Sequence, residues 1–436
     1  MTPPLRLRTA KAGRLKRSSP GKDSMRSFFR KHYHWVIVAV CCGFSGVAAG
    51  LAVNCMGVFY LPVSKELGVG VGDVSFYLTI LNIVQGLLSA VVVRTMKHVP
   101  LRLMLAIAAA VGTGCYLLMS LGTSVWHFYL VAVLLGAANA FTGMIVGNVV
   151  IANWFEKKMG TAMAIFMALA GVLGAVLSPV FAGLIETIGW RNVYRIAAAI
   201  EVILLAPAII LVRLSPAEMG LKKYGEGESE PAEKKTRAIV IPEERKFGMK
   251  SAGTVMLYLI ACLASFAATI SQHLSGYAAS IGRSPAFGAS LISASMIGNI
   301  VTKLAAGVIG DRIGAVKATV LLLLTAGTGC LVLGLLPLSA DPLLYAAAFV
   351  TGGFYAVTGV SNLSLVKERF RALEFAKIIA YMNIARMVPQ AISHSAIGYS
   401  YDFFGSYRPA MLLCAGIAAV SIGASLMIAR LKVKTK

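Results

Sequence analysis

The sequence predicts an all-α membrane protein with twelve transmembrane helices arranged as two six-helix bundles. Hydrophobic residues make up 58% of the 436 residues, and charged residues only 14%. The mean hydropathy is +0.77, and the apolar share lies above that of ordinary soluble domains. A bilayer core requires about 20 apolar residues per helix. Twelve such stretches can be placed, six on each side of one long polar segment.

The twelve predicted helices follow one another with short polar turns between them. Those of the first half cover residues 35–60, 74–93, 102–121, 126–152, 161–185 and 193–211, and those of the second half cover 253–279, 287–309, 316–336, 343–366, 378–401 and 410–428. The segment 214–250 is rich in Glu, Lys, Gly and Pro, and it cannot bury enough apolar surface to fold alone. We therefore predict a basic tail at 1–34, bundles at 35–213 and 251–430, a linker at 214–250, and a tail at 431–436.

The distribution of Lys and Arg predicts the orientation in the membrane. With both termini in the cytoplasm, 34 of the 41 Lys and Arg residues lie on the inner side and five on the outer side, as the positive-inside rule requires. The net charge of +23 could suggest nucleic-acid binding, but the basic N-terminal segment lacks aromatics that could stack on bases. We expect contacts with the lipid bilayer, including anionic lipid, and no nucleic acid. The first apolar stretch is too long for a cleavable signal.

The sequence contains no pattern that is typical of a catalytic site. There is no His-rich cluster, no Ser-His-Asp set at one depth and no metal-ligand spacing, so we expect neither an enzyme nor a metal or cofactor site. The seven cysteines lie in apolar stretches, and we expect them to pack as small hydrophobic residues. A membrane sensor, which binds a solute without moving it across the membrane, is an alternative to a transporter.

Two cations, Lys303 and Arg386, lie inside predicted helices of the second half. Each is eight residues from a helix end, which is about 12 Å at the helical rise, and therefore close to the middle of the bilayer. A charge at this depth costs roughly 2.5 to 3.5 kcal/mol, and neither helix offers a carboxylate at comparable depth. The missing counter-charge could be an anionic substrate. The alternative is that the cations contact backbone carbonyls, helix C-termini or Glu201, or that they snorkel to the interface.

Other polar residues inside the helices are weaker candidates. Tyr277, Tyr355 and Tyr381 could clamp a planar anion through hydroxyls and ring faces, although packing within a bundle explains each equally well. Asn54 and Gln85 must find polar partners in the bilayer, either in a cavity or between helices.

Two titratable groups are candidates for coupling transport to protons. His273 could respond to pH in the physiological range, although a structural histidine is the simpler interpretation. Glu201 is the one carboxylate well inside a predicted helix, and a structural or Arg-paired role is favoured there.

A motif in the second half carries more specific information. "GVIGDRIGAVK" places Gly307, Asp311, Arg312 and Gly314 in the pattern G-x-x-x-D-R-x-G-x-x-K. The glycines permit close helix approach and a sharp turn, and Asp311 could cap or pair across the loop. With twelve helices around it, this pattern resembles the loop signature of the major facilitator superfamily. The equivalent turn of the first half has Ala90 and Arg94 where the signature has Gly and Asp.

The resemblance extends over most of the chain. "NWFEKKMGTAMAIFMALAGVLGAVLSPVFAGLIETIGWRNVY" (153–194), "HLSGYAASIGRSPAFGASLISASMIGNIVTKLAAGVIGDRIG" (273–314) and "GYSYDFFGSYRPA" (398–410) resemble, in the right order, the oxalate/formate antiporter and monocarboxylate transporter branch. The resemblance implies an alternating-access carrier of small organic anions, mono- or dicarboxylates. It also implies a location in a bacterial inner membrane.

The same resemblance assigns roles to the two cations. Antiporters of this branch carry basic residues where Lys303 and, by position in the eleventh helix, Arg386 stand. Lys303 replaces the more common Arg, so bidentate carboxylate recognition is disfavoured there. Many symporters of the branch have an Asp one turn earlier, where this chain has Asn299. Asn cannot titrate, which favours exchange and leaves proton symport as the alternative.

Overall fold

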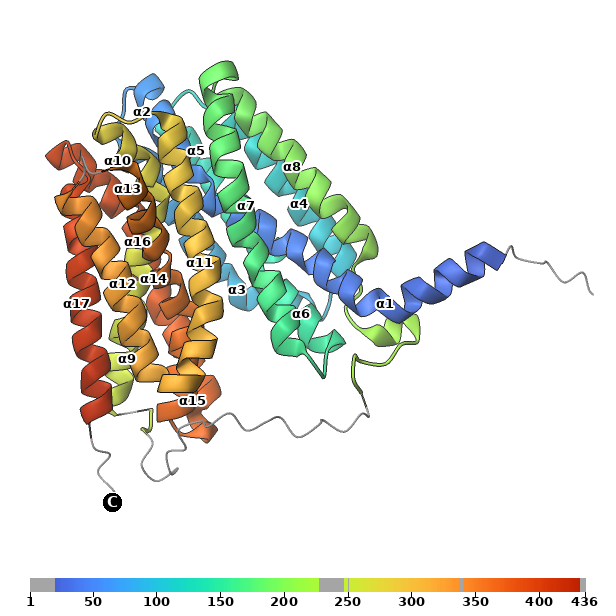
Figure 1. Cartoon of the computed structure of the whole chain (residues 1–436). Helices are drawn as coiled ribbons and strands as arrows, with labels where there is room; N and C mark the ends of the chain where they lie inside the picture. Colours follow the sequence, from blue (N-terminus) through green and yellow to red (C-terminus); the bar gives the residue numbers. More distant parts are fainter. Residues whose placement is uncertain (1–19, 227–246, 250, 337–339, 432–436) are drawn as a thin grey trace, which may run out of the picture.

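The computed structural model describes residues 20–226, 247–249, 251–336 and 340–431. Figure 1 shows two groups of long, roughly parallel helices, one formed by the first half of the chain and one by the second half. Eleven helical segments within the described parts are long and apolar enough to cross a membrane. The 30-residue helix α16 (Phe375–Phe404) is equally long but more polar. It lies among them as the twelfth crossing, so the predicted helical membrane architecture is confirmed.

The first half contains the first six crossings. Its elements are α1 (Pro20–Ser45), η1 (Gly46–Asn54), η2 (Met56–Val58), α2 (Tyr60–Leu67), α3 (Val71–Thr95), α4 (Leu101–Met119), α5 (Val125–Thr142), α6 (Met144–Trp154), α7 (Met159–Ile188) and α8 (Trp190–Leu211). The helix α1 begins at Pro20, earlier than the predicted boundary at residue 35. Hydropathy marks the start of the apolar stretch, whereas the polar residues before it are also compatible with a helix.

The second half repeats this plan. Its elements are α9 (Ala252–Ala268), η5 (Thr269–His273), α10 (Leu274–Ser280), α11 (Pro285–Ile313), α12 (Ala315–Leu335), α13 (Asp341–Thr351), α14 (Gly353–Ala356), η6 (Val357–Ser361), α15 (Asn362–Arg369), η7 (Ala372–Glu374), α16 and α17 (Arg408–Arg430). In Figure 1 the last turn of α17 and the described ends of the linker lie at the lower end. We call this the terminal end and the opposite end the distal end.

The first, seventh and tenth crossings are interrupted near their middle. The first contains the π-helical segment η1, the seventh the 3-10 segment η5, and the tenth the π-helical segment η6. Such irregular segments leave backbone groups and side chains free for other contacts. At one of these breaks Gly57 lies so close to the carbonyl oxygen of Gln272 that an added Cβ would come within 1.8 Å of it. The continuous apolar sequence predicts an unbroken helix for each of the three crossings, and the structure differs in all three.

Two helix pairs join the halves. Helix α3 packs against α16, and α7 packs against α11. Helices α7 and α11 run side by side in Figure 1. Glycine makes the second contact possible, because an added Cβ at Gly171 would meet Ile300 at 2.9 Å and one at Gly174 would meet Met296 at 3.1 Å. Small residues let helices in a bilayer approach closely.

The two ends of the predicted linker attach to related loops of the two halves. Tyr224 forms a backbone bridge to Phe155, and Phe247 forms one to Phe370. Phe155 follows the fourth crossing and Phe370 follows the tenth, so the linker holds each half at an equivalent place. The rest of the predicted linker, most of the N-terminal tail and all but the first residue of the C-terminal tail lie outside the described residues.

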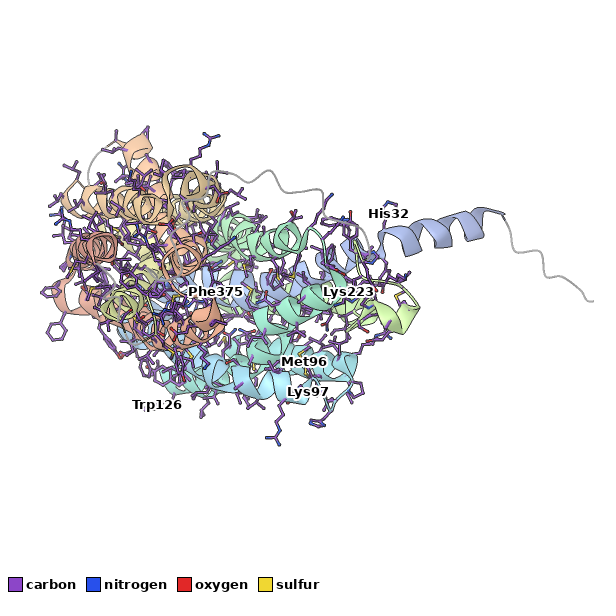
Figure 2. The ribbon with its side chains drawn as sticks, turned by 90° about the horizontal axis from the view of Figure 1, so that it is seen from below. His32, Met96, Lys97, Trp126, Lys223 and Phe375 are labelled. Atoms are coloured by element: carbon purple, nitrogen blue, oxygen red, sulfur yellow. The ribbon has the colours of Figure 1, made fainter. Side chains whose placement is uncertain are left out.

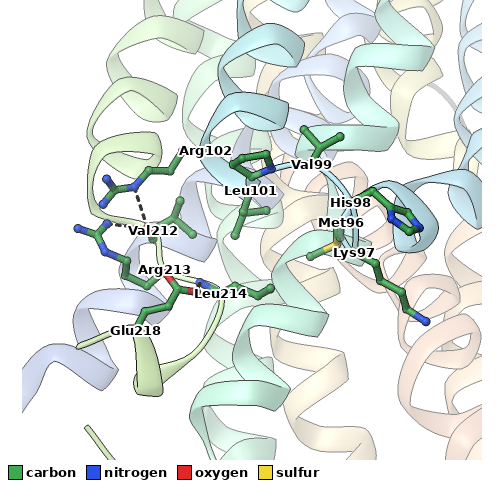
Figure 3. Close-up of a pocket in the computed structure, with 11 residues that line it drawn as sticks. Met96, Lys97, His98, Val99, Leu101, Arg102, Val212, Arg213, Leu214 and Glu218 are labelled. Atoms are coloured by element: carbon green, nitrogen blue, oxygen red, sulfur yellow. Dashed lines mark hydrogen bonds between the residues drawn. The ribbon is translucent and has the colours of Figure 1, made fainter. Parts of the chain in front are cut away.

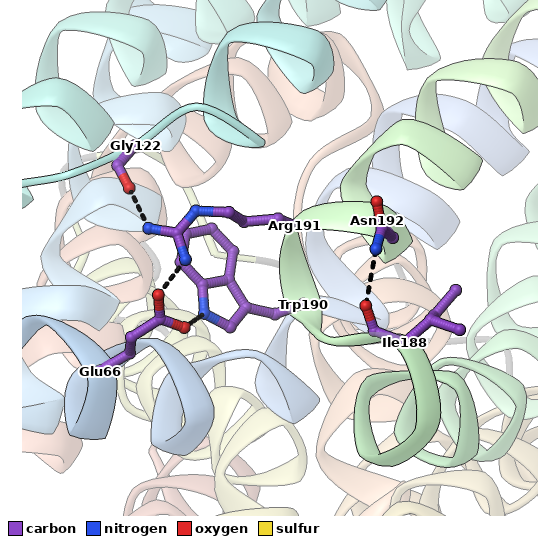
Figure 4. A network of polar contacts seen from close by, with 6 residues as sticks. All are labelled: Glu66, Gly122, Ile188, Trp190, Arg191 and Asn192. Carbon is purple, nitrogen blue, oxygen red and sulfur yellow. Dashed lines mark hydrogen bonds and ion pairs between the residues drawn. The ribbon is translucent and has the colours of Figure 1, made fainter.

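A polar network at the distal end fastens α2 to α8 in the first half. The indole of Trp190 and the guanidinium of Arg191 both donate to the carboxylate of Glu66, and Arg191 also donates to the carbonyl of Gly122 at 3.0 Å (Figure 4). The hydrogen bond from Arg191 is the main cause that lowers the pKa of Glu66, which lies outside the membrane-spanning segments.

Candidate substrate site between the two halves

Lys303 lies on the face of α11 that contacts the first half. Ile300, one turn earlier, packs against Gly171 of α7. The ammonium of Lys303 lies over the ring of Tyr355, 5.9 Å from its centroid. The side chain also passes close to Gly359 in the irregular segment η6. Lys303 is half-buried.

Arg386 occupies the corresponding level of α16. It directly precedes Met387, which packs against Gly86 of α3. Its Nε donates to the side-chain oxygen of Asn383 at 3.0 Å. The charges of Lys303 and Arg386 are close enough to repel each other.

Neither cation forms an ion pair with a carboxylate in the parts of the chain that the structure describes. Two like charges near one another in a low-dielectric region are unfavourable unless an anion or water compensates them. The structure therefore brings together, at one level, the two cations that the sequence analysis singled out.

The contact between α11 and α7 is closed toward the distal end and stops at the level of Lys303. Ser293 donates to the carbonyl of Ala175 at 2.6 Å, and Met296 and Ile300 follow on the same face. One turn further toward the terminal end, Leu304 is 63% exposed, and a Cβ added at Gly307 would meet nothing within 4 Å. Close packing of Gly307 against another helix was expected and is not found.

The contact between α16 and α3 also stops near the level of the cations. Its carbonyl at Ala391 accepts a hydrogen bond from Thr79 of α3 at 2.7 Å, and Met387 packs on Gly86 one turn later. After another turn Ile384 is 63% exposed. The two halves thus contact each other over the distal half of the interface, and Lys303 and Arg386 lie where these contacts stop.

The three candidate tyrosines have different surroundings. The hydroxyl of Tyr355 accepts a hydrogen bond from Gln272 of η5 at 2.8 Å, so this ring is positioned beside Lys303. Tyr277 is fully buried and donates to the carbonyl of Leu333 at 2.8 Å, which directs its hydroxyl toward α12. Tyr381 is 52% exposed. Of the three, Tyr355 is the one that the structure places against a cation.

The two candidate amides lie in the first half. Asn54 is buried and donates to the carbonyl of Ala170 at 2.9 Å, which is the interhelical hydrogen bond considered as the alternative to cavity lining. Gln85 directly precedes Gly86 and lies beside Gly143. It is half-buried, at the same level as the cations.

Glu201 and His273 do not lie beside the two cations. Glu201 is 1% exposed and packs on Gly112 of α4. Within the described residues it forms no ion pair, so the Arg pairing considered for it is not found. His273 lies in the distal half, between the rings of Tyr60 and Tyr407.

The loop motif forms the expected turn with a different capping group. Gly314 adopts a φ of +89°, which glycine tolerates best. The backbone N–H of Ala315, the first residue of α12, donates to the carboxylate of Glu368 at 2.6 Å. Asp311 and Arg312 are exposed and have no side-chain hydrogen bond or ion pair with the residues that the structure describes. The capping considered for Asp311 is thus not found among the described residues, and Glu368 of α15 caps α12 instead.

Two cavities at the terminal end lie away from the cations. One, of about 500 Å³, is lined by the turn between α3 and α4 and by the end of α8, with Arg102 and Arg213 on one side and Lys97 on the other (Figure 3). Lys97 also appears at the edge of the molecule in Figure 2, which looks at the terminal end. The second cavity, of about 470 Å³, lies at the equivalent turn between α11 and α12.

Comparison with known proteins identifies the family. Residues 42–278 and 254–436 match the family model described as Major Facilitator Superfamily. The chain belongs to the major facilitator superfamily. This superfamily protein is an integral membrane transporter and not an enzyme, as the sequence analysis predicted.

Curated relatives of this superfamily transporter support the predicted branch. It is 25% identical over 317 residues to monocarboxylate transporter 13 of Bos taurus, covering 70% of this chain and 68% of that protein. The rat protein of the same name is 24% identical over 327 residues, covering 73% and 70%. The chain is therefore similar, over about 70% of its length, to proteins named monocarboxylate transporters.

Solved structures of the superfamily share the fold. The crystal structure of the nucleoside transporter NupG has a TM-score of 0.70 at 12% identity, covering 91% of this chain and 99% of that one. A bacterial homologue of the human lysosomal transporter Spinster, in an inward-facing and occupied conformation, has a TM-score of 0.67 at 12% identity, with coverages of 92% and 97%. At these identities the likeness concerns the fold alone.

Proposed function

We propose that this transporter carries small organic anions, mono- or dicarboxylates, and that Lys303 and Arg386 bind the carboxylate. The observation that carries the proposal is their placement: two neighbouring cations, without a described carboxylate partner, at the level where contact between the halves ends. A carboxylate bound there would relieve their repulsion and gain charge-assisted hydrogen bonds. Tyr355 positions Lys303, and Asn383 holds the guanidinium of Arg386. The relatives named monocarboxylate transporters agree with this substrate class.

The proposed mechanism is alternating access by movement of the two halves. With the distal contacts closed, the site communicates with the terminal end, where Leu304 and Ile384 are exposed. Separation of α3 from α16 and of α7 from α11 at the distal end would open the other side. Exchange is the favoured coupling, because Asn299 cannot titrate one turn before Lys303. Proton-coupled symport is the alternative.

Counterflow into proteoliposomes tests the substrate class. Vesicles loaded with oxalate, formate, lactate, pyruvate, malonate or succinate would be assayed for uptake of the same labelled anion at two pH values. Uridine serves as a neutral solute, since one structural neighbour is a nucleoside transporter. The proposal expects uptake of at least one carboxylate and none of uridine. Uptake of uridine alone, or binding of a carboxylate without counterflow, would contradict it.

Charge-removing variants test the site. Each of Lys303→Gln and Arg386→Gln removes a charge-assisted contact of about 1.5 to 3 kcal/mol, so uptake at low substrate concentration should fall roughly ten- to hundredfold. Lys303→Arg and Arg386→Lys, which keep the charge, should retain more activity than the Gln variants. Lys65→Gln removes an exposed cation at the distal end and should transport normally. Normal uptake by both Gln variants would refute the assignment.

We further propose that the terminal end faces the cytoplasm, as the distribution of Lys and Arg favours. A green fluorescent protein fused to the C-terminus should then fluoresce, and an alkaline phosphatase fused there should stay inactive. The reverse pattern would mean that the distal end, and not the terminal end, faces the cytoplasm.

A further inference from the structure

Two buried histidines lie together in the distal half of the second bundle. His273 ends the 3-10 segment η5, and His394 lies in α16; both are 0% exposed. None of their four ring nitrogens forms a hydrogen bond of ordinary geometry with a described residue, although the ring of His273 lies beside the backbone of His394. A neutral imidazole carries one N–H donor and one acceptor nitrogen. Buried polar groups normally have partners, and unpaired ones call for an explanation.

A hydrogen bond holds the two segments that carry these histidines together. The hydroxyl of Thr269, four residues before His273, donates to the hydroxyl of Ser393 at 2.8 Å. Ser393 directly precedes His394. The two imidazoles are close enough for their charges to interact, so protonation of one ring would disfavour protonation of the other.

Both histidines adjoin the distal interface between the halves. The ring of Tyr60, from the first half, lies 5.2 Å from the ring of His273. On the other side of the pair, Thr79 of α3 donates to the carbonyl of Ala391 at 2.7 Å and to Ser395 at 3.2 Å. The closed interface therefore covers the pair, and separation of the halves would uncover it.

The groups that face the pair offer no counter-charge. Tyr60 comes from α2, Tyr407 precedes α17 with its ring 5.8 Å from His273, and Tyr355 lies near Tyr60. The carboxylate of Asp402 lies near Tyr407, but its oxygens accept hydrogen bonds from the start of α3. A positive imidazole in the closed interface would have neither water nor an anion beside it, which is costly. Water entering an open interface would remove this cost.

We propose that His273 and His394 form a proton-binding site that solvent reaches only when the distal interface opens. The proton binds a ring nitrogen of the open state, and the closed state releases it. By linkage, acid then shifts the transporter toward the distally open state. The inference uses the proposed movement of the two halves and is independent of the substrate.

Distances between spin labels across the distal end test this without any substrate. Labels at Lys65→Cys and Ala286→Cys, both exposed, would report separation of the halves. The background carries Cys262→Ser, since the other six cysteines are buried. Double electron–electron resonance would be recorded at about pH 7.5 and about pH 5.5, on either side of the ordinary histidine pKa of about 6.5.

The expected result is a rise of the long-distance population at the lower pH. It should amount to at least about threefold and at most about tenfold per pH unit for one bound proton. The pair His273→Gln and His394→Gln should abolish this rise, and His127→Gln, at a half-buried histidine of α5 away from the pair, should leave it intact. The same rise in the double variant, or no rise in the unaltered pair, would overturn the proposal.

A second measurement guards against a folding defect of the double variant. Each single variant would be checked for an unaltered elution volume and for unaltered label distances at about pH 7.5, and then titrated; each should weaken the response. Full responses from both correctly folded single variants would also overturn the proposal. Because no carboxylate is present, failure of the proposed substrate class would leave this result unaffected.

Discussion

The carboxylate of Asp402, near the distal end of α16, accepts a hydrogen bond from the backbone N–H of Gly72 at 2.7 Å. It also accepts one from Val71 at 2.8 Å. Both donors belong to the first turn of α3, so a residue of one half caps a helix of the other. A carboxylate at a helix N-terminus is favoured by the unpaired N–H groups and by the helix dipole. This contact closes the distal end directly.

Replacing Asp402 with Asn should weaken distal closure. The loss of charge at the α3 terminus should cost about 0.3 to 1 kcal/mol, a roughly two- to fivefold shift toward the distally open state. A Ser395→Cys reporter at the buried interface should then react faster with a membrane-impermeant thiol reagent added from the distal side. Asp341→Asn breaks a distal ion pair with Arg283 within the second half and serves as the control. Equal reactivity in both variants would contradict this role of Asp402.

Introducing a methyl group at Gly57 should have a larger effect on the same contact. An added Cβ would come within 1.8 Å of the backbone oxygen of Gln272, and a backbone group cannot rotate away as a side chain can. The closed state should therefore be strongly disfavoured in Gly57→Ala, and the Ser395→Cys reporter should become reactive. Gly114→Ala adds a methyl where nothing lies within 4 Å and should behave like the parent. An unreactive reporter in Gly57→Ala would show that the approach is not needed for closure.

Tyr355 should matter more through its ring than through its hydroxyl. Tyr355→Phe keeps the aromatic face beneath Lys303, whereas Tyr355→Leu removes a cation–π contact of about 0.5 to 2 kcal/mol. We expect the apparent substrate affinity to fall roughly two- to thirtyfold in the Leu variant and less in the Phe variant. Concentration dependence of counterflow measures both. Equal losses in Tyr355→Phe and Tyr355→Leu would point instead to the hydrogen bond from Gln272, because both variants lack the hydroxyl.

Glu368, not Asp311, should stabilise the turn of the loop motif. Glu368→Gln removes the charge that caps α12 and should reduce the free energy of unfolding by about 1 kcal/mol. Asp311→Asn should change it little, because Asp311 is exposed. Thermal unfolding in detergent, followed by tryptophan fluorescence, compares the two variants. The opposite ranking would restore the capping role predicted for Asp311.

The network around Glu66 should make distal stability depend on pH. The hydrogen bond from Arg191 lowers the pKa of Glu66, so its contribution is present above the ordinary carboxyl pKa of about 4.3 and is lost as the pH falls through the lowered value. The parent should therefore unfold at a higher temperature than Glu66→Gln near neutral pH. This difference should shrink under acid conditions. A difference that grows with acidity would contradict the sign of the shift.

Much of the fold could be predicted from the sequence, because hydropathy and charge act locally. Helix α11 was expected at 287–309 and is found at Pro285–Ile313, and the two cations lie at one level, as counting residues along each helix suggested. The breaks at η1, η5 and η6 were not predicted, because apolar composition continues through them. Gln272 and His394 also went unnoticed, since nothing in the local pattern distinguishes them from other buried polar residues.

The sequence by itself determined the membrane environment, the two-half plan and the presence of two cations at mid-depth, because these depend on composition and on the helical rise. Only the tertiary structure decided that Asp402 caps α3, 330 residues earlier in the chain, and that Glu368 rather than Asp311 caps α12. It also decided that His273 and His394 lie together. Such pairings depend on which helices become neighbours and how each is rotated about its axis, and no local pattern of residues encodes either property.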